Sequence, residues 1–114
     1  MKTRTITALL KDDNYIFVRL KGENVRRRFL QEAEKEGFTY SDGTSPTETD
    51  GDDIMAIHSD MTLSYVGYIS RLAYKNVKIK GDKKIVRIDY VKYIAGAERY
   101  VIKRKEAIAE QPGI

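Results

Sequence analysis

One segment constrains the fold of this chain more than any other: residues 24–36 have the pattern of an amphipathic helix. Apolar side chains recur there at the three- and four-residue spacing of a helix, and charged side chains cover the remaining surface. The apolar positions are Val25, Phe29, Leu30 and Ala33. Asn24 is predicted to cap the helix, and Gly37 to end it in a left-handed conformation. Because such a polar helix is not stable alone in water, we expect it to pack on a sheet.

Strand patterns occupy most of the remaining chain. Residues 15–20 are apolar almost without a break, which indicates a central strand covered on both faces. A short helical turn is predicted at residues 91–95. The other predicted strands are 3–10, 54–58, 62–69, 77–80, 84–90 and, at an edge, 100–102. The pattern indicates an α+β domain, with a mostly antiparallel sheet of about five or six strands and the 24–36 helix on one face.

Length and composition limit both the organisation and the chemistry of the chain. A chain of 114 residues fits one domain, which we place at residues 1–105, followed by a frayed tail at 106–114. The absence of cysteine excludes disulfides, thiol catalysis and cysteine metal sites, and it fits a reducing cytoplasm. No apolar run reaches the ~20 residues that span a membrane. We therefore expect a soluble cytoplasmic protein.

Charge is distributed unevenly along the chain, although the net charge is only +4. Residues 1–41 carry nine basic and six acidic side chains, and residues 61–114 carry twelve basic and five acidic ones. Residues 42–60 carry six acidic side chains and no lysine or arginine. A basic surface interrupted by an acidic loop suits a nucleic acid or a partner of mixed charge, and an ordinary solvated surface gives the same pattern.

No motif for catalysis or for a cofactor is present. His58 is the only histidine, and its place in a strand pattern favours a core or rim position over a general base. The glycines form neither a dinucleotide fingerprint nor a P-loop. Asp50, Asp52 and Asp53 suit a hard cation but lack EF-hand spacing, so turn formation, or imitation of nucleic-acid phosphates, accounts for them as well. We expect no catalytic residue, no cofactor and no metal.

A basic hairpin offers a nucleic-acid-binding function. Lys78 and Lys80 point the same way in the predicted hairpin, and with Lys84 and Arg87 they would form a ridge that follows phosphates. Lysines on an edge strand also prevent edge-to-edge aggregation, which is the alternative explanation. The arginines at residues 26–28 spread over about 200° of the helix surface, so all three cannot face one ligand.

Tyrosine is abundant, with eight copies and no tryptophan. Tyr68 lies close to Arg71 along the chain, and tyrosine beside arginine suits a protein interface or base stacking. Packing on a sheet face, with the hydroxyl group reaching water, is the structural alternative for each tyrosine. The group as a whole favours a binding surface.

Three stretches, Phe29–Thr47, Asp52–His58 and Leu63–Ile69, make the chain similar to small accessory proteins of Gram-positive phages and conjugative elements. In those proteins a helix that ends in glycine and an aromatic residue leads into a D-G or S-G turn and then a hairpin. The stretch Arg87–Gly96 also resembles that setting. The resemblance implies a bacterial host and supplies no catalytic residue. Small non-enzymatic proteins of such elements include inhibitors of host defence, anti-CRISPR proteins among them.

These observations lead to one favoured function and two alternatives. We expect a non-catalytic binding protein of a phage or mobile genetic element that blocks a host defence protein or nucleoprotein complex stoichiometrically. The residues expected to bind the partner are Arg27, Tyr40, Asp42, Asp52, Asp53, Tyr68 and Arg71. The alternatives are a nucleic-acid-binding protein that uses the basic hairpin and a sponge for a small molecule such as a nucleotide. The oligomeric state stays open, with a homodimer among the options.

Overall fold

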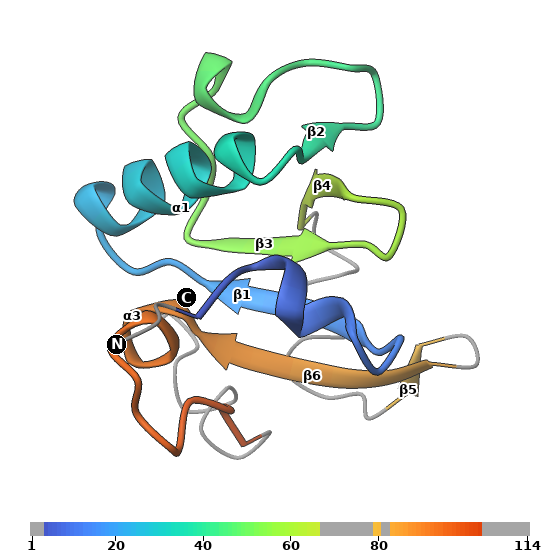
Figure 1. Ribbon diagram of the computed structural model, residues 1–114, viewed down its shortest axis with the longest axis vertical. Coiled ribbons are helices and arrows are strands. Elements are labelled where there is room, and N and C mark those ends of the chain that lie inside the picture. Colours follow the sequence, from blue (N-terminus) through green and yellow to red (C-terminus); the bar gives the residue numbers. More distant parts are fainter. Residues whose placement is uncertain (1–3, 67–78, 81–82, 104–114) are drawn as a thin grey trace, which may run out of the picture.

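The computed structural model describes residues 4–66, 79–80 and 83–103 of the chain. Figure 1 shows a twisted sheet with the long helix α1 lying along one side of it. The N-terminal half of the chain consists of η1 (Thr7–Leu10), β1 (Tyr15–Arg19), α1 (Glu23–Lys35), β2 (Thr39–Tyr40) and η2 (Pro46–Glu48). It is followed by β3 (Ile54–Ile57), β4 (Thr62–Tyr65), β5 (Ile79–Lys80), β6 (Lys83–Asp89) and α3 (Tyr90–Ile94).

In the described residues, six strands form one mixed sheet in the order β2-β4-β3-β1-β6-β5. β1 lies inside the sheet, antiparallel to β3 and parallel to β6. β3 and β4 pair antiparallel, and β5 and β6 pair antiparallel as the predicted basic hairpin. The α+β class is therefore confirmed, and the position of β1 agrees with its apolar sequence. The two parallel pairings, β1 with β6 and β2 with β4, were not predicted.

The main core lies between α1 and one face of the sheet. Phe29, Leu30 and Ala33 of α1 are buried there, on the apolar stripe that the sequence indicates. The sheet contributes Ile16, Val18, Leu20, Met55, Ile57, Leu63 and Ile88. Edge-to-face packing of the Phe29 ring on the Tyr90 ring, with centroids 5.2 Å apart, joins α1 to α3.

The ends of α1 differ slightly from the prediction. The helix begins at Glu23 after Gly22, whose φ of 103° marks the turn, so Asn24 lies inside the helix and is not its cap. At the other end Gly37 has a φ of 98°, which confirms the left-handed stop. The N–H of Phe38 then bonds to the Ala33 carbonyl at 2.9 Å and turns the chain toward β2.

The predicted strand at residues 3–10 is wrong, because this segment forms the short helix η1. The carboxylate of Glu36, just past the last residue of α1, accepts hydrogen bonds from the N–H groups of Ile6 and Thr7 at 3.0 and 2.8 Å. It also accepts one from the Thr7 hydroxyl group at 2.6 Å. These bonds satisfy the unpaired N–H groups at the start of η1. A strand propensity read from neighbouring residues cannot register an acceptor 29 or 30 positions away.

Arg4 fastens the start of the described chain to the end of α3. Its guanidinium group donates to the carbonyl oxygens of Tyr93 and Ala97 at 3.2 and 2.6 Å, which caps the carboxyl end of this helix. The same group lies over the rings of Tyr93 and Tyr100, 5.5 and 4.8 Å from their centroids. The predicted helical turn at residues 91–95 is confirmed as α3. The predicted edge strand at 100–102 is reduced to a bridge between Ile88 and Val101.

A second core lies on the opposite face of the sheet. Because successive strand residues point to opposite faces, Phe17 points away from its neighbours Ile16 and Val18 in the main core. Phe17 is fully buried and packs in a cluster with Ile54, Ala56, Val66, Ile85 and Ile102. Arg19 and Asp89 share this face and form an ion pair across the parallel pairing of β1 and β6.

Candidate binding surface

The acidic loop, residues 41–53, is hydrogen-bonded to α1. The sequence alone does not indicate whether this loop is ordered. The carboxylate of Glu34 accepts hydrogen bonds from the backbone N–H and the hydroxyl group of Thr47 at 3.1 and 2.6 Å. These bonds lower the pKa of the Glu34 carboxyl below its usual range. Ser45 and Glu48 form a capping box around η2, and Pro46 between them is buried. The middle of the loop is therefore held at several points.

Two further contacts hold the ends of the acidic loop. The Tyr40 hydroxyl oxygen lies 2.7 Å from the Thr49 hydroxyl oxygen, so the end of the loop contacts β2, the strand that precedes the loop. Burial raises the pKa of Tyr40 to about 12, which keeps this hydroxyl group protonated. Gly51 has a φ of 69°, and a Cβ atom at this position would stand 3.1 Å from Leu30 Cδ1. The backbone of the loop thus passes close to the side of α1.

The acidic side chains of this loop face solvent. Asp42, Glu48, Asp50 and Asp53 are exposed, and Asp52 is half-buried. The Asp42 carboxylate accepts the Thr44 N–H at 3.0 Å, and this bond lowers the pKa of the Asp42 carboxyl. No lysine or arginine occurs between positions 42 and 60, so the loop presents a negative surface.

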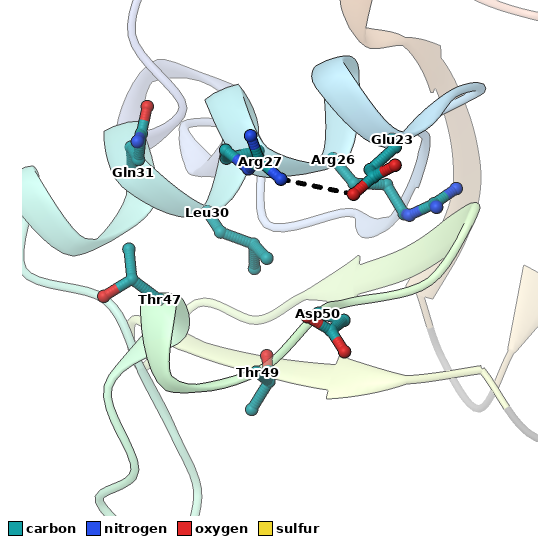
Figure 2. Close-up of a pocket in the computed structure, with 8 residues that line it drawn as sticks. All are labelled: Glu23, Arg26, Arg27, Leu30, Gln31, Thr47, Thr49 and Asp50. Carbon is teal, nitrogen blue, oxygen red and sulfur yellow. Dashed lines mark hydrogen bonds and ion pairs between the residues drawn. The ribbon is translucent and has the colours of Figure 1, made fainter.

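The helix–loop cleft lies between α1 and η2 and has a volume of about 440 Å³. Figure 2 shows Leu30 of α1 pointing toward the loop, with Thr47 and Asp50 on the opposite wall. Arg27, a predicted binding residue, lines this cleft and donates a hydrogen bond to Glu23 at 3.2 Å. Both of these side chains are largely exposed, so the ion pair leaves them able to exchange partners.

The tyrosine cleft is lined by residues of the acidic loop and of β4, and it has a volume of about 300 Å³. The rings of Tyr40 and Tyr65 stack there with centroids 5.5 Å apart and planes 13° from parallel. Tyr40 is buried, whereas Tyr65 is 49% exposed. Asp42 lines the same cleft, and Thr49 lines both this cleft and the helix–loop cleft. The loop therefore contributes residues to both clefts.

The structure groups some of the predicted binding residues and leaves others outside. Tyr40 and Asp42 line the tyrosine cleft, and Arg27 lines the helix–loop cleft across the loop. Asp52 and Asp53 lie where the loop enters β3; the Asp52 carboxylate accepts the Asp53 N–H at 2.7 Å, and the Asp53 carbonyl accepts the Leu20 N–H at 2.6 Å. Tyr68 and Arg71 lie outside the described residues.

The basic hairpin is only partly described. Lys78 lies outside the described residues, and only the backbone of Lys80 is described, in β5. Lys84 is exposed. Arg87 is 5% exposed and points to the second face of the sheet, which leaves little of its guanidinium group for a phosphate.

Three residues of this surface were not selected from the sequence: Thr49, Asp50 and Tyr65. Tyr65 stacks on Tyr40 because β2 pairs with β4 and sets Tyr40 opposite Leu63, and a pairing between such separate segments leaves no pattern in the neighbouring residues. The sequence indicates Asp50 only as a candidate ligand of a hard cation, and it has no motif that includes Thr49. The hydroxyl–hydroxyl contact of Thr49 with Tyr40, nine positions apart, is a tertiary feature.

His58 has a structural environment. Its Nε2 lies 2.8 Å from the Ser64 hydroxyl oxygen, and the Tyr15 ring packs edge-on against the imidazole with centroids 5.6 Å apart. These partners come from neighbouring strands of the sheet, which fits the predicted core or rim position. Within residues 4–66, 79–80 and 83–103, no group of three or more potential ligands is placed to hold a metal ion.

Comparisons with protein families, with curated proteins and with solved structures found no match to this chain. Among the residues that the structure describes, no helix has the length and apolar character needed to cross a membrane.

Proposed function

We propose that this chain is a non-catalytic binding protein of a phage or mobile genetic element that blocks a host defence protein or nucleoprotein complex stoichiometrically. The acidic loop is the centre of the binding surface, and α1 supports it. The observation that carries the proposal is the fastening of this loop to α1 through Glu34 and Thr47, with acidic side chains left in solvent.

Order in the free protein favours binding. A flexible loop loses conformational freedom when it meets a partner, and that loss weakens the complex. The capping box of Ser45 and Glu48, together with the bond between Tyr40 and Thr49, fixes most of the loop backbone beforehand. A purely structural connection between β2 and β3 would not need so many contacts outside the sheet. The loop is therefore suited to recognition.

The charge of the loop indicates the chemistry of the partner. Four exposed carboxylates on a fixed backbone attract a positive surface and increase the rate of encounter with it. Defence complexes that hold nucleic acid present such positive surfaces, because the phosphate backbone must be neutralised there. A protein that occupies this surface excludes the nucleic acid without any chemical step. Inhibition by steric and electrostatic blocking follows, at one inhibitor per site.

The experiment is a pull-down of the tagged full chain from a Gram-positive lysate, with and without nuclease, followed by an activity assay of the captured complex. The test variant combines Asp42→Asn with Asp50→Lys, which keeps the local hydrogen bond of residue 42. The control combines Glu98→Gln with Asp12→Lys, two exposed positions outside the loop with the same total change in charge. We expect the partner to survive nuclease, to be lost from the test variant and to be retained by the control.

Loss of partner from both double variants, with unchanged melting temperatures, would contradict the role of the loop, because net charge alone would explain binding. Recovery of nucleic acid alone would support the basic hairpin instead. That alternative has less support from the described residues, since Arg87, one of its four predicted binding residues, is buried. A partner that binds but keeps its full activity would contradict the inhibitor function.

A further inference from the structure

The tyrosine cleft combines an aromatic face with a carboxylate. Tyr65 is half exposed, and its ring is braced from behind by the buried ring of Tyr40. Tyr40 is itself held by the hydrogen bond to Thr49. A ring braced in this way keeps one orientation before a ligand arrives, so its stacking on a ligand costs little conformational entropy.

The charge on the cleft has one sign. Asp42 supplies a carboxylate, held in place by the N–H of Thr44, and no lysine or arginine lines the cleft among the described residues. An aromatic ring attracts a cation toward its face, and a nearby carboxylate pairs with the same cation. The cleft is therefore matched to a flat or compact positive group.

The chain contains one pair of tyrosine rings that already holds an arginine side chain. The Arg4 guanidinium group lies over the rings of Tyr93 and Tyr100 and donates to backbone oxygens beside them. The rings of this pair meet edge-on, with centroids 4.9 Å apart and planes 71° from parallel, whereas the rings of Tyr40 and Tyr65 are stacked with planes 13° from parallel. A pair of tyrosine rings with oxygen acceptors next to it thus receives an arginine side chain in this fold.

We propose that the tyrosine cleft receives an arginine side chain of the protein partner, stacked on Tyr65 and paired with Asp42. This inference rests on the proposed function, because it assigns the chemistry of one contact in that binding surface. Arginine fits better than lysine since a planar guanidinium group stacks on a ring and bonds to a carboxylate at the same time. A phosphate group is disfavoured by the Asp42 carboxylate.

The test uses a capped tetra-arginine peptide as the probe, titrated into the full chain and followed by backbone amide shifts in NMR. A capped tetracitrulline peptide is the neutral control of the same shape, and a tetralysine peptide is the control of the same charge. We expect tetra-arginine to shift the amides of residues 40–44 and 63–65, tetralysine to bind more weakly, and tetracitrulline not to bind. Tyr65→Leu should weaken tetra-arginine binding by about three- to fivefold.

Asp42→Asn keeps the acceptor for the Thr44 N–H and removes the charge, and it should weaken binding about tenfold. The matched control is Glu98→Gln, an equal change of charge at an exposed position outside the binding surface, which should weaken binding by less than about twofold. Melting temperatures of the three variants check that each is folded. Equal losses from Asp42→Asn and Glu98→Gln, equal binding of tetra-arginine and tetralysine, or unchanged binding by Tyr65→Leu would each overturn the arginine assignment.

The two proposals fail in different ways. If Tyr65→Leu leaves capture of the partner unchanged while the double variant at residues 42 and 50 abolishes it, the proposed function holds and the arginine assignment is wrong. If the peptide binds as expected but no partner is captured from the lysate, the cleft chemistry holds and the proposed function is contradicted.

Discussion

Arg19 on β1 and Asp89 on β6 are register partners in the parallel pairing at the centre of the sheet, and their side chains form an ion pair. The Asp89 carboxylate also accepts the Lys92 N–H at 3.2 Å and thereby caps α3. One carboxylate therefore joins an early strand of the chain to its last described helix.

We predict that Asp89→Ala lowers the free energy of unfolding by about 3 kcal/mol, because it leaves a largely buried guanidinium group without this partner and removes the helix cap. The relative exposures of 20% for Arg19 and 13% for Asp89 support this size of effect. Asp89→Asn is the matched variant, which retains a capping oxygen and loses the charge, and should cost less. Urea unfolding measures both. A loss below about 1 kcal/mol for the alanine variant would contradict the importance of the pair.

Glu34 should make the stability of the acidic loop depend on pH. Hydrogen bonds from Thr47 lower the pKa of Glu34 from 4.5 in the folded chain. A carboxyl group whose pKa is lower in the folded chain stabilises the fold at pH values above its pKa in the unfolded chain. This stabilisation is lost as the pH falls through the pKa of the folded chain. The difference in stability between the natural chain and Glu34→Gln should therefore shrink as the pH falls below 4.5. Urea unfolding over a pH series tests this, and a difference that is constant with pH would contradict it.

Two buried tyrosines should limit stability in alkali. Burial raises the pKa of Tyr40 and of Tyr90 from 10.0 to about 12. A tyrosine whose pKa is higher in the folded chain stabilises the fold fully below pH 10.0. This stabilisation is lost as the pH rises toward about 12, because the tyrosine ionises more readily in the unfolded chain. Tyr90→Phe keeps the buried ring, so its stability should fall less steeply in this window. Denaturant unfolding with absorbance titration of tyrosinate measures this, and equal slopes for both proteins would contradict it.

Gly51 should be more sensitive to substitution than Gly43. Both have positive φ angles, 69° and 88°, so alanine at either site costs about 1 kcal/mol of backbone strain. Only Gly51 would also bring its Cβ to 3.1 Å from Leu30 Cδ1, whereas Gly43 has nothing within 4 Å. Gly51→Ala should therefore destabilise the chain by about 1 kcal/mol more than Gly43→Ala. Equal midpoints in thermal unfolding for Gly51→Ala and Gly43→Ala would show that the loop backbone at residue 51 is not in close contact with Leu30 of α1.

The features that the sequence predicted are those set by neighbouring residues. The apolar stripe of Phe29, Leu30 and Ala33 indicated α1 and its buried face, and Gly37 indicated its end. The apolar run at residues 15–20 indicated a strand buried on both faces, which β1 confirms. Periodicity and glycine conformation act over a few residues, so they can be recognised in the sequence alone.

The features that the sequence did not predict depend on distant contacts. η1 forms because Glu36 lies beside Thr7, and the acidic loop is ordered because Glu34 lies beside Thr47. The burial of Arg87 and the stacking of Tyr40 on Tyr65 follow from strand neighbours that are set by the whole sheet. Charge and composition indicated where a binding surface lies, but its two clefts emerge only from the packing of the loop on α1.

The parallel pairing of β1 with β6 has a consequence for the order of events during synthesis. β1 is complete at residue 19, but its parallel partner β6 begins only at residue 83. Until that partner emerges from the ribosome, one edge of an apolar strand has its N–H and C=O groups open to other chains. The closing step joins segments far apart in sequence, so it is intrinsically slow. A host that makes this protein therefore has a period of vulnerability to aggregation that ends only when the last described strand and α3 dock.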